Sequence, residues 1–174
     1  DIDAGVIKGL YVLGENPAMS DPDLTHTRKG LAKLDHLVVQ DIFMTETAWF
    51  ADIILPATAH AEKLGTYTNT NRQVQIGRNV VEPPKGVKQD WWIIQEIAKR
   101  IGLNWNYTSP KEIFDEMKLI MPSLNYISWE RLEKENYVTY PVKSENALGE
   151  EIIFHDGFPT SNKLGKIMPV DIIY

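Results

Sequence analysis

The chain has 174 residues, of which 43% are hydrophobic and 24% charged, as in a soluble globular protein of one domain or one and a half. A formal net charge of -6 disfavours a nucleic-acid binder, and no apolar run approaches the ~18 residues of a membrane span. The absence of cysteine excludes disulfides, thiolate metal sites and iron–sulfur clusters within the chain. Residues Asp1 to Gly5 contain neither an initiator Met nor a signal peptide, so we expect an internal piece of a longer protein.

The first part of the chain alternates strand and helix patterns. Val6–Leu13 is apolar and strand-like, and Gly14 after it permits a positive φ and a close approach of a ligand to the backbone. A helix begins within Ser20–Leu24, with a capping Ser or Asp and an early Pro, and keeps helical spacing to Leu34. His36–Asp41 is the next strand. This alternation predicts the α/β class, with a Rossmann-like parallel β-α-β sheet.

A chemically mixed stretch, Thr45–Glu62, adds another helix and strand. Met44–Phe50 predicts a short helix and Asp52–Leu55 a buried strand, which Pro56 ends. The small residues at 57–59 leave open backbone at the carboxyl end of that strand. Ligands of open α/β sheets bind at this end, so we expect a binding site there.

After the sheet, one strand and one amphipathic helix are predicted. Arg72–Arg78 alternates like a strand. Asp90 is well placed to cap a helix that ends at Gly102. Its predicted apolar stripe is Trp91, Ile94, Ala98 and Ile101.

The last third predicts helices followed by a β-hairpin. Ser109–Met121 opens with a capping box of Ser109 and Glu112, and Trp129–Glu135 is a short charged helix. Ile152–Phe154 and Lys166–Met168 could pair as the carboxyl-terminal hairpin. The predicted divisions are an α/β cofactor-binding part at 1–59, an extension at 60–108, and a helical cover with hairpin at 109–174.

Two local patterns leave alternatives open. Gly14–Pro17 is either a ligand-free turn or a turn that, with the following helix start, holds an anionic group on backbone N–H groups. The Gly-x-Gly-x-x-Gly fingerprint is absent, so a plain nicotinamide or flavin site is not supported. His60 and Glu62 could suggest a metal pair, but without a third ligand nearby a surface pair is favoured.

Two motifs carry a resemblance to a known family. Thr45–Glu62 reads as small and hydroxyl residues, Ala-Asp, two aliphatics, Leu-Pro, small residues and Glu. That order resembles a signature of the molybdopterin (dimethyl sulfoxide reductase-type) oxidoreductases. Gly14-Glu-Asn-Pro17, a helix and then Val38–Ala48 resemble formate dehydrogenase alpha (catalytic) subunits in particular. The resemblance is strong over Gly9–Asp90 and implies an internal or carboxyl-terminal-half fragment of such a subunit.

The resemblance also implies a cofactor-binding role for particular residues. Asn16 and Ser20 match an Asp or Asn and a hydroxyl residue that contact one guanosine end of a bis-(molybdopterin guanine dinucleotide), and Gln40 matches a cofactor-contacting Gln. Asp90 matches a contact near the pterin, a role compatible with a helix cap. The Gln40 side chain could instead form its hydrogen bonds with backbone groups, and Asp41 could be an exposed acidic residue at the end of the strand. We expect these side chains to converge at one sheet edge. The full set implied to bind cofactor is Gly14, Glu15, Asn16, Ser20, Gln40, Asp41, Thr45, Ala57 and Asp90.

Other parts of the enzyme are implied outside this chain. The resemblance implies Mo or W on the molybdopterin guanine dinucleotide, a 4Fe-4S cluster in an absent amino-terminal part, and formate oxidation to CO2 by the parent. No residue here is implied as catalytic or metal-binding. Implied partners are the remaining domains and electron-transfer subunits, on the cytoplasmic or periplasmic side of a prokaryotic cell. Asn71 and Gln73 replace a family Glu and Arg, so no charge contact is expected there. A stand-alone nucleotide-binding module and a purely structural module of a respiratory complex stay as alternatives.

Overall fold

The computed structural model describes residues 1–171, which form two compact units. The first contains Asp1–Gly65 and Gly77–Ile113, and the second contains Thr66–Ile76 and the chain from Phe114 onward. The three-part division predicted at residues 59 and 108 stays a prediction. No helix of residues 1–171 is long and apolar enough to cross a bilayer.

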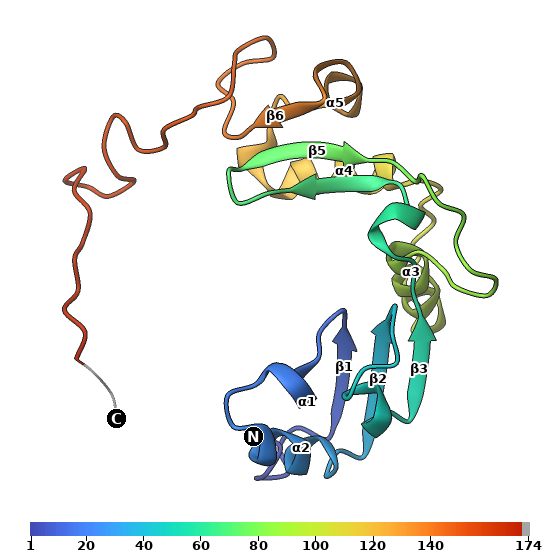
Figure 1. The fold of residues 1–174 in the computed structure, drawn as a ribbon. Helices are drawn as coiled ribbons and strands as arrows, with labels where there is room; N and C mark the ends of the chain where they lie inside the picture. Colours follow the sequence, from blue (N-terminus) through green and yellow to red (C-terminus); the bar gives the residue numbers. More distant parts are fainter. Residues whose placement is uncertain (172–174) are drawn as a thin grey trace. The chain divides into compact units, whose positions relative to one another are not determined.

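The first unit is built on a three-stranded parallel sheet (Figure 1). Its strands are β1 (Gly9–Leu13), β2 (His36–Asp41) and β3 (Ile53–Pro56), in the order β1-β2-β3. Leu13 is in register with Gln40, and Gln40 with Leu55. The predicted α/β class with a parallel β-α-β sheet is therefore confirmed.

Helical segments cover one face of this sheet. They are α1 (Pro17–Ser20), α2 (Leu24–Leu31) and the 3-10 turn η1 (Ala48–Phe50). The Asp23 carboxylate caps α2 by accepting a hydrogen bond from the His26 N–H at 3.0 Å. The buried cluster between sheet and helices contains Val12, Ala18, Leu31, Leu37, Val39 and Ala48.

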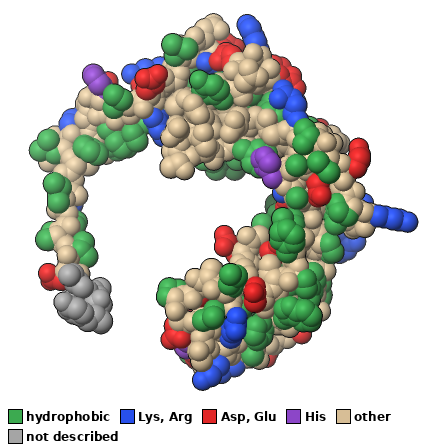
Figure 2. All heavy atoms as spheres, viewed as in Figure 1, with side chains coloured by type: hydrophobic (Ala, Val, Ile, Leu, Met, Phe, Trp, Pro, Cys, Tyr) green, Lys and Arg blue, Asp and Glu red, His purple; other side chains and the backbone are tan. Residues whose placement is uncertain are grey.

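The opposite face of the sheet is apolar and largely open. Side chains alternate along a strand, so the residues between the core positions point to this second face. Tyr11, Leu13 and Ile53 are among its exposed members. Figure 2 shows that hydrophobic side chains also lie at the surface in other parts of the molecule.

Two further elements of the first unit follow the sheet, η2 (His60–Glu62) and α3 (Asp90–Arg100). The prediction that Asp90 caps α3 is wrong, because Gln89 holds the cap position and Asp90 is the first helical residue. The predicted stripe is also partly wrong: Ala98 is buried together with Ile93, whereas Ile101 is 71% exposed. Aromatic and aliphatic residues lie on several sides of this helix, so the sequence pattern alone did not identify the face that packs against the rest of the unit.

The second unit contains an antiparallel sheet and helices. The strands are β4 (Gly65–Thr68), β5 (Gln73–Gly77) and β6 (Tyr137–Thr139), in the order β4-β5-β6, with β5 and β6 antiparallel. Along the chain lie α4 (Pro110–Ile120), η3 (Pro122–Leu124) and α5 (Trp129–Glu135). Ser109 caps α4 and Ser128 caps α5 through their hydroxyl oxygens. Buried residues of this unit include Val74, Phe114, Leu124, Ile127, Leu132 and Val138.

The predicted pairing of Ile152–Phe154 with Lys166–Met168 is wrong. Neither segment forms a strand, and Ile152 and Ile167 are 70% and 93% exposed. An isolated hairpin is marginal in water unless other elements cover it. The antiparallel pairing of this unit is instead made by β5 with β6.

Candidate functional site

Four side chains form a hydrogen-bonded line at the carboxyl end of the parallel sheet. Buried Gln40 accepts a hydrogen bond from the Tyr11 hydroxyl and donates from Nε2 to Asp90 Oδ1 at 2.8 Å. Asp90 Oδ2 in turn forms an ion pair with Lys63 Nζ. Burial, and secondly the negative charge of Asp90, raises the pKa of the Tyr11 phenol, so Tyr11 remains a protonated donor at neutral pH.

Exposure differs along this line. Gln40 is 0% exposed, whereas the side chains of Lys63 and Asp90 are 25% and 27% exposed and Tyr11 is 39% exposed. In this conformation a ligand can touch Tyr11, Lys63 and Asp90, but not Gln40. Gln40 therefore serves to fix the side chains of Tyr11 and Asp90.

A second network is centred on Asn16, just beyond β1. Its Oδ1 accepts hydrogen bonds from the Thr47 N–H at 3.1 Å and the Thr47 hydroxyl at 2.8 Å. Its Nδ2 donates to Glu46 Oε2 at 2.7 Å, and this hydrogen bond lowers the pKa of the Glu46 carboxyl. The Thr47 oxygen also accepts from the Ala18 N–H at 3.0 Å. Asn16 thus ties the turn after β1 to the segment before η1.

Several of the other predicted residues have local structural contacts. The Ser20 hydroxyl donates to the Asn16 carbonyl at 3.1 Å. One carboxylate oxygen of Asp41 accepts from the N–H groups of Ile42 and Phe43 at 2.7 and 3.0 Å. The Thr45 hydroxyl oxygen accepts from the Ala48 N–H at 3.2 Å. These contacts shape the loops at the edge and leave part of each oxygen's acceptor capacity unused.

The remaining predicted residues lie at the same carboxyl edge. Gly14 has a φ of 64°, and nothing lies within 4 Å of the place where a Cβ would be. Its N–H donates to the Gln40 carbonyl at 2.9 Å, and the N–H of buried Ala57 donates to the Asp41 carbonyl at 3.0 Å. Glu15 is exposed. The backbone beside Gly14 is therefore open to close approach.

The residues expected to converge divide into two networks. Val39 packs in the core with Ala48, so Gln40, the next residue of the strand, points to the opposite face. Asn16 instead contacts Thr47, which directly precedes Ala48. Asn16 and Ser20 therefore lie on one side of the carboxyl edge, and Gln40 and Asp90 on the other.

The structure adds residues that the sequence did not indicate. Tyr11 and Lys63 complete one network, and Glu46 and Thr47 the other. Thr47 lies within the stretch Thr45–Glu62, two positions after Thr45. This second hydroxyl residue could have been recognised from the sequence as a candidate site residue. Nothing in the local sequence marks Tyr11 or Lys63, since their partners are 29 and 27 positions away.

His60 and Glu62 have a structural setting in η2. Glu62 Oε2 accepts a hydrogen bond from the Ala59 N–H at 2.8 Å, so this carboxylate stabilises the start of the turn. Within residues 1–171 no group of at least three His, Cys, Asp or Glu side chains could hold a metal ion.

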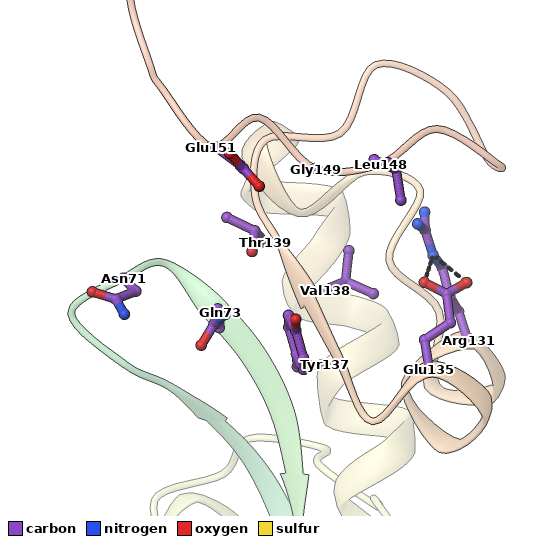
Figure 3. A pocket seen from close by; sticks show the side chains of 10 residues that line it. All are labelled: Asn71, Gln73, Arg131, Glu135, Tyr137, Val138, Thr139, Leu148, Gly149 and Glu151. Carbon is purple, nitrogen blue, oxygen red and sulfur yellow. Dashed lines mark hydrogen bonds and ion pairs between the residues drawn. The ribbon is translucent and has the colours of Figure 1, made fainter.

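The second unit has a cavity of about 460 Å³, whose lining residues are drawn in Figure 3. The charged pair in its wall is Arg131 and Glu135, with N–O distances of 3.0 and 3.1 Å. Arg131 also donates to the carbonyls of Tyr126, Glu145 and Ala147 at 3.2, 3.0 and 2.8 Å. Since these bonds hold the guanidinium in place, Arg131 ties loops together, and the sheet edge is the stronger candidate site.

Comparison with known proteins identifies the class to which this sheet and edge belong. Residues 2–100 match the family described as molybdopterin oxidoreductase. Because this match spans more than half of the chain, the protein belongs to the molybdopterin oxidoreductase family. The family predicted from Thr45–Glu62 is thereby confirmed, and the family implies a molybdopterin cofactor with Mo or W.

Individual relatives are named as formate dehydrogenases. The chain is 46% identical over 167 residues to the F420-dependent formate dehydrogenase subunit alpha of Methanocaldococcus jannaschii, covering 95% of this chain and 25% of that protein. It is 41% identical over 162 residues to the putative formate dehydrogenase YrhE of Bacillus subtilis, covering 93% of this chain and 16% of that protein. The chain thus spans about a quarter or less of the length of these relatives.

A solved structure shares the fold. Acetylene hydratase from Pelobacter acetylenicus superposes with a TM-score of 0.63 at 27% identity, over 76% of this chain and 18% of that chain. The fold of this chain is therefore shared with part of that acetylene hydratase.

Proposed function

We propose that this chain is part of the alpha subunit of a Mo- or W-dependent oxidoreductase that oxidises formate to CO2. Its role there is to bind the guanosine end of a molybdopterin guanine dinucleotide at the carboxyl edge of the parallel sheet. Two relatives named formate dehydrogenase, each matched over more than nine-tenths of this chain, support the activity. The observation that carries the binding role is the pair of side-chain networks at that edge.

The donor and acceptor groups at the edge fit a nucleoside. The carboxylates of Glu46 and Asp90 belong to the two networks, and that of exposed Glu15 lies in the turn between β1 and α1. Carboxylates accept hydrogen bonds from N–H and O–H groups, which guanine and ribose supply. The open space at Gly14 admits a ligand close to the backbone. An acidic edge favours this end of the cofactor over its diphosphate, because like charges repel.

The chain's residues contribute binding and orientation. When bound, the cofactor supplies the redox chemistry of its metal centre, and the protein positions it. Gln40 and Asn16 hold the edge side chains in fixed orientations before any ligand arrives, which lowers the entropy lost on binding. No residue of this chain is assigned to the oxidation step. The proposal places a 4Fe-4S cluster, the remaining domains and electron-transfer subunits outside the chain.

The test is the composition of the alpha subunit that contains this chain. The purified subunit is denatured in acid, the bound cofactor is hydrolysed, and nucleotides, pterin and metal are quantified. We expect guanosine 5′-monophosphate together with Mo or W. Pterin without a guanine nucleotide would contradict the guanosine role, and a subunit without pterin would indicate a structural module.

A further inference from the structure

The parallel sheet is open along the outer side of β3. In the order β1-β2-β3, this strand lies at one side of the sheet (Figure 1). The Asp52 N–H donates to the Leu37 carbonyl at 2.9 Å, so alternation directs the N–H groups of Ile53 and Leu55 away from β2. An edge of this kind is a template for pairing with an added strand.

The segment before α3 already occupies the outer side of β3 at its carboxyl end. Lys88 forms a parallel bridge with Ala57. Its N–H donates to the Pro56 carbonyl at 3.2 Å, and its carbonyl accepts from the Thr58 N–H at 3.0 Å. The Ala57 N–H itself donates to a carbonyl of β2, so Lys88 lies on the opposite, outer side. A segment that pairs with residues 53–55 would therefore lie in line with Lys88.

A groove of about 380 Å³ lies at the end of this open edge. Its apolar wall is formed by Leu55 and Pro56 from β3 and by Trp92, Ile93 and Ile97 from α3. Trp92 is 38% exposed, so a ligand can reach its ring. None of these residues belongs to the two networks of the carboxyl edge, and all lie in the first unit. The groove is placed to take a large apolar side chain of a strand paired with β3.

The rim of the groove is basic. Lys88 Nζ lies 5.0 Å from the centroid of the Trp92 ring, which keeps the ammonium group beside the apolar wall. Glu96 is the acidic residue of the lining, and it is already paired with Lys99 at 3.1 Å and with Arg100 at 2.9 Å. Positive charge therefore exceeds negative charge here, although the chain as a whole carries a formal charge of -6.

We infer that an acidic, extended segment of a separate protein chain docks at this groove by strand addition. Its backbone pairs with the outer edge of β3, and one large apolar side chain enters the groove beside Trp92. Its carboxylates face Lys88 and Arg100. Strand addition of this kind combines main-chain hydrogen bonds with pockets for alternate side chains. The inference goes beyond the proposed function and does not depend on the cofactor role of the carboxyl edge.

The charges favour this occupant over two others. Two copies of the present chain, each with a net charge of -6, repel one another. A permanently packed domain of the same polypeptide would form an interface that is more apolar than this rim. An aromatic anchor within a charged, solvent-accessible rim is typical of contacts between separate chains.

The binding test uses the 174-residue chain labelled with ¹⁵N and a synthetic peptide, acetyl-Glu-Asp-Val-Phe-Val-Asp-Glu-amide. We expect NMR shifts of the Ile53, Leu55 and Lys88 amides and of the Trp92 indole. Serine in place of the peptide's Phe should weaken binding roughly tenfold, because burial of the ring is lost. A basic peptide, with Lys at the four acidic positions, should also bind roughly tenfold more weakly.

Backbone-modified peptides separate strand addition from insertion of a side chain alone. N-methylation removes N–H donors from the acidic peptide and keeps every side chain. Alternate amides of a strand point to opposite sides, so one alternate set would face β3 and the other would face solvent. We expect methylation of one set to abolish binding and methylation of the other set to leave it intact.

A charge reversal tests the role of the rim. Lys88→Glu should weaken binding of the acidic peptide roughly tenfold and strengthen binding of the basic one. Lys85→Glu is the matched control, because Lys85 is exposed in the same loop and does not line the groove. Circular dichroism verifies folding, and Lys88→Gln replaces Lys88→Glu if the latter unfolds.

The source of the segment is tested with the purified alpha subunit that contains this chain. A separate partner requires an open groove, so the subunit should bind the acidic peptide as the isolated chain does. Binding by the chain but not by the subunit would show that another domain of the same polypeptide covers the groove. A dimer of the chain in sedimentation that Lys88→Glu dissociates would show that a second copy does.

Three further results would overturn the inference. They are no binding of the acidic peptide, equal affinity for the acidic and basic peptides, and equal effects of the two N-methylated sets. An unchanged affinity in both Lys88→Glu and Lys88→Gln would remove the assigned role of the rim charge, and with it the acidic character of the partner.

Discussion

Two threonines near the carboxyl edge differ in how their hydroxyl groups are satisfied. Thr47 is 0% exposed, and its hydroxyl both donates to Asn16 and accepts from the Ala18 N–H. Thr58 is 3% exposed, and its hydroxyl has no hydrogen-bond partner among residues 1–171. A buried hydroxyl without a partner costs free energy, whereas a paired one stabilises the fold.

Replacing each threonine by valine, which has nearly the same shape, should therefore give opposite results. We expect Thr47→Val to lower the free energy of unfolding by about 1–3 kcal/mol, because it removes the acceptor of the buried Ala18 N–H and one of the two hydrogen bonds to Asn16 Oδ1. Thr58→Val should be neutral or stabilising by up to about 1 kcal/mol. Urea unfolding of the isolated chain, followed by circular dichroism, measures both. Equal losses in the two variants would show that Thr58 has a partner in solution.

At this scale the sequence could indicate only part of the site. Asn16, Gln40 and Asp90 were marked by their positions in a family pattern, and all three are central to the observed networks. Tyr11 and Lys63 could not be found, because their contacts depend on strand register and on the path of distant loops. The sequence also could not predict that Asn16 and Gln40 lie on opposite sides of one edge. Asn16 lies beyond the end of its strand, where side-chain alternation no longer predicts to which face of the sheet a side chain points.

Among the elements, β2 was the most predictable. Its observed bounds, His36–Asp41, are those predicted, because a short apolar run between polar ends is typical of a central parallel strand. The face of α3 and the terminal hairpin were not predictable. In α3, tertiary packing buries Ile93 rather than Ile94. Near residues 152–168 the sequence has strand-like patterns, but no other element covers these segments, so they do not form a hairpin.

Hydrogen exchange tests the order of the parallel strands. β2 is central, so Val38 and Val39 should exchange slowly. In β3 the Asp52 N–H donates to the Leu37 carbonyl at 2.9 Å, and the alternating ladder predicts that Ile54 donates inward while the Ile53 N–H points away. We expect slow exchange at Ile54 and faster exchange at Ile53. If all four amides exchange as fast as those of residues 143–149, the parallel sheet is contradicted.

For the whole molecule, the main physical feature is an apolar sheet face that residues 1–171 cover only in part. Parallel sheets are almost always buried on both faces, yet Leu13 and Ile53 are 41% and 45% exposed here. The relative from Methanocaldococcus jannaschii is about four times as long as the aligned region, since the match covers 25% of it. We expect the remaining domains of the proposed alpha subunit to cover this face.

The substitution Ile53→Thr tests that expectation, because its effect should depend on context. In the isolated chain the side chain is half exposed, so the free energy of unfolding should change by no more than about 0.5 kcal/mol. In the alpha subunit the same side chain would be buried, and the loss should reach about 1–3 kcal/mol. Thermal unfolding of both proteins measures the difference. Val39→Thr is the control. Val39 is 0% exposed, so this substitution should destabilise both the isolated chain and the alpha subunit. A loss for Ile53→Thr that is equally small in the two proteins would mean that this face stays open to solvent in the subunit.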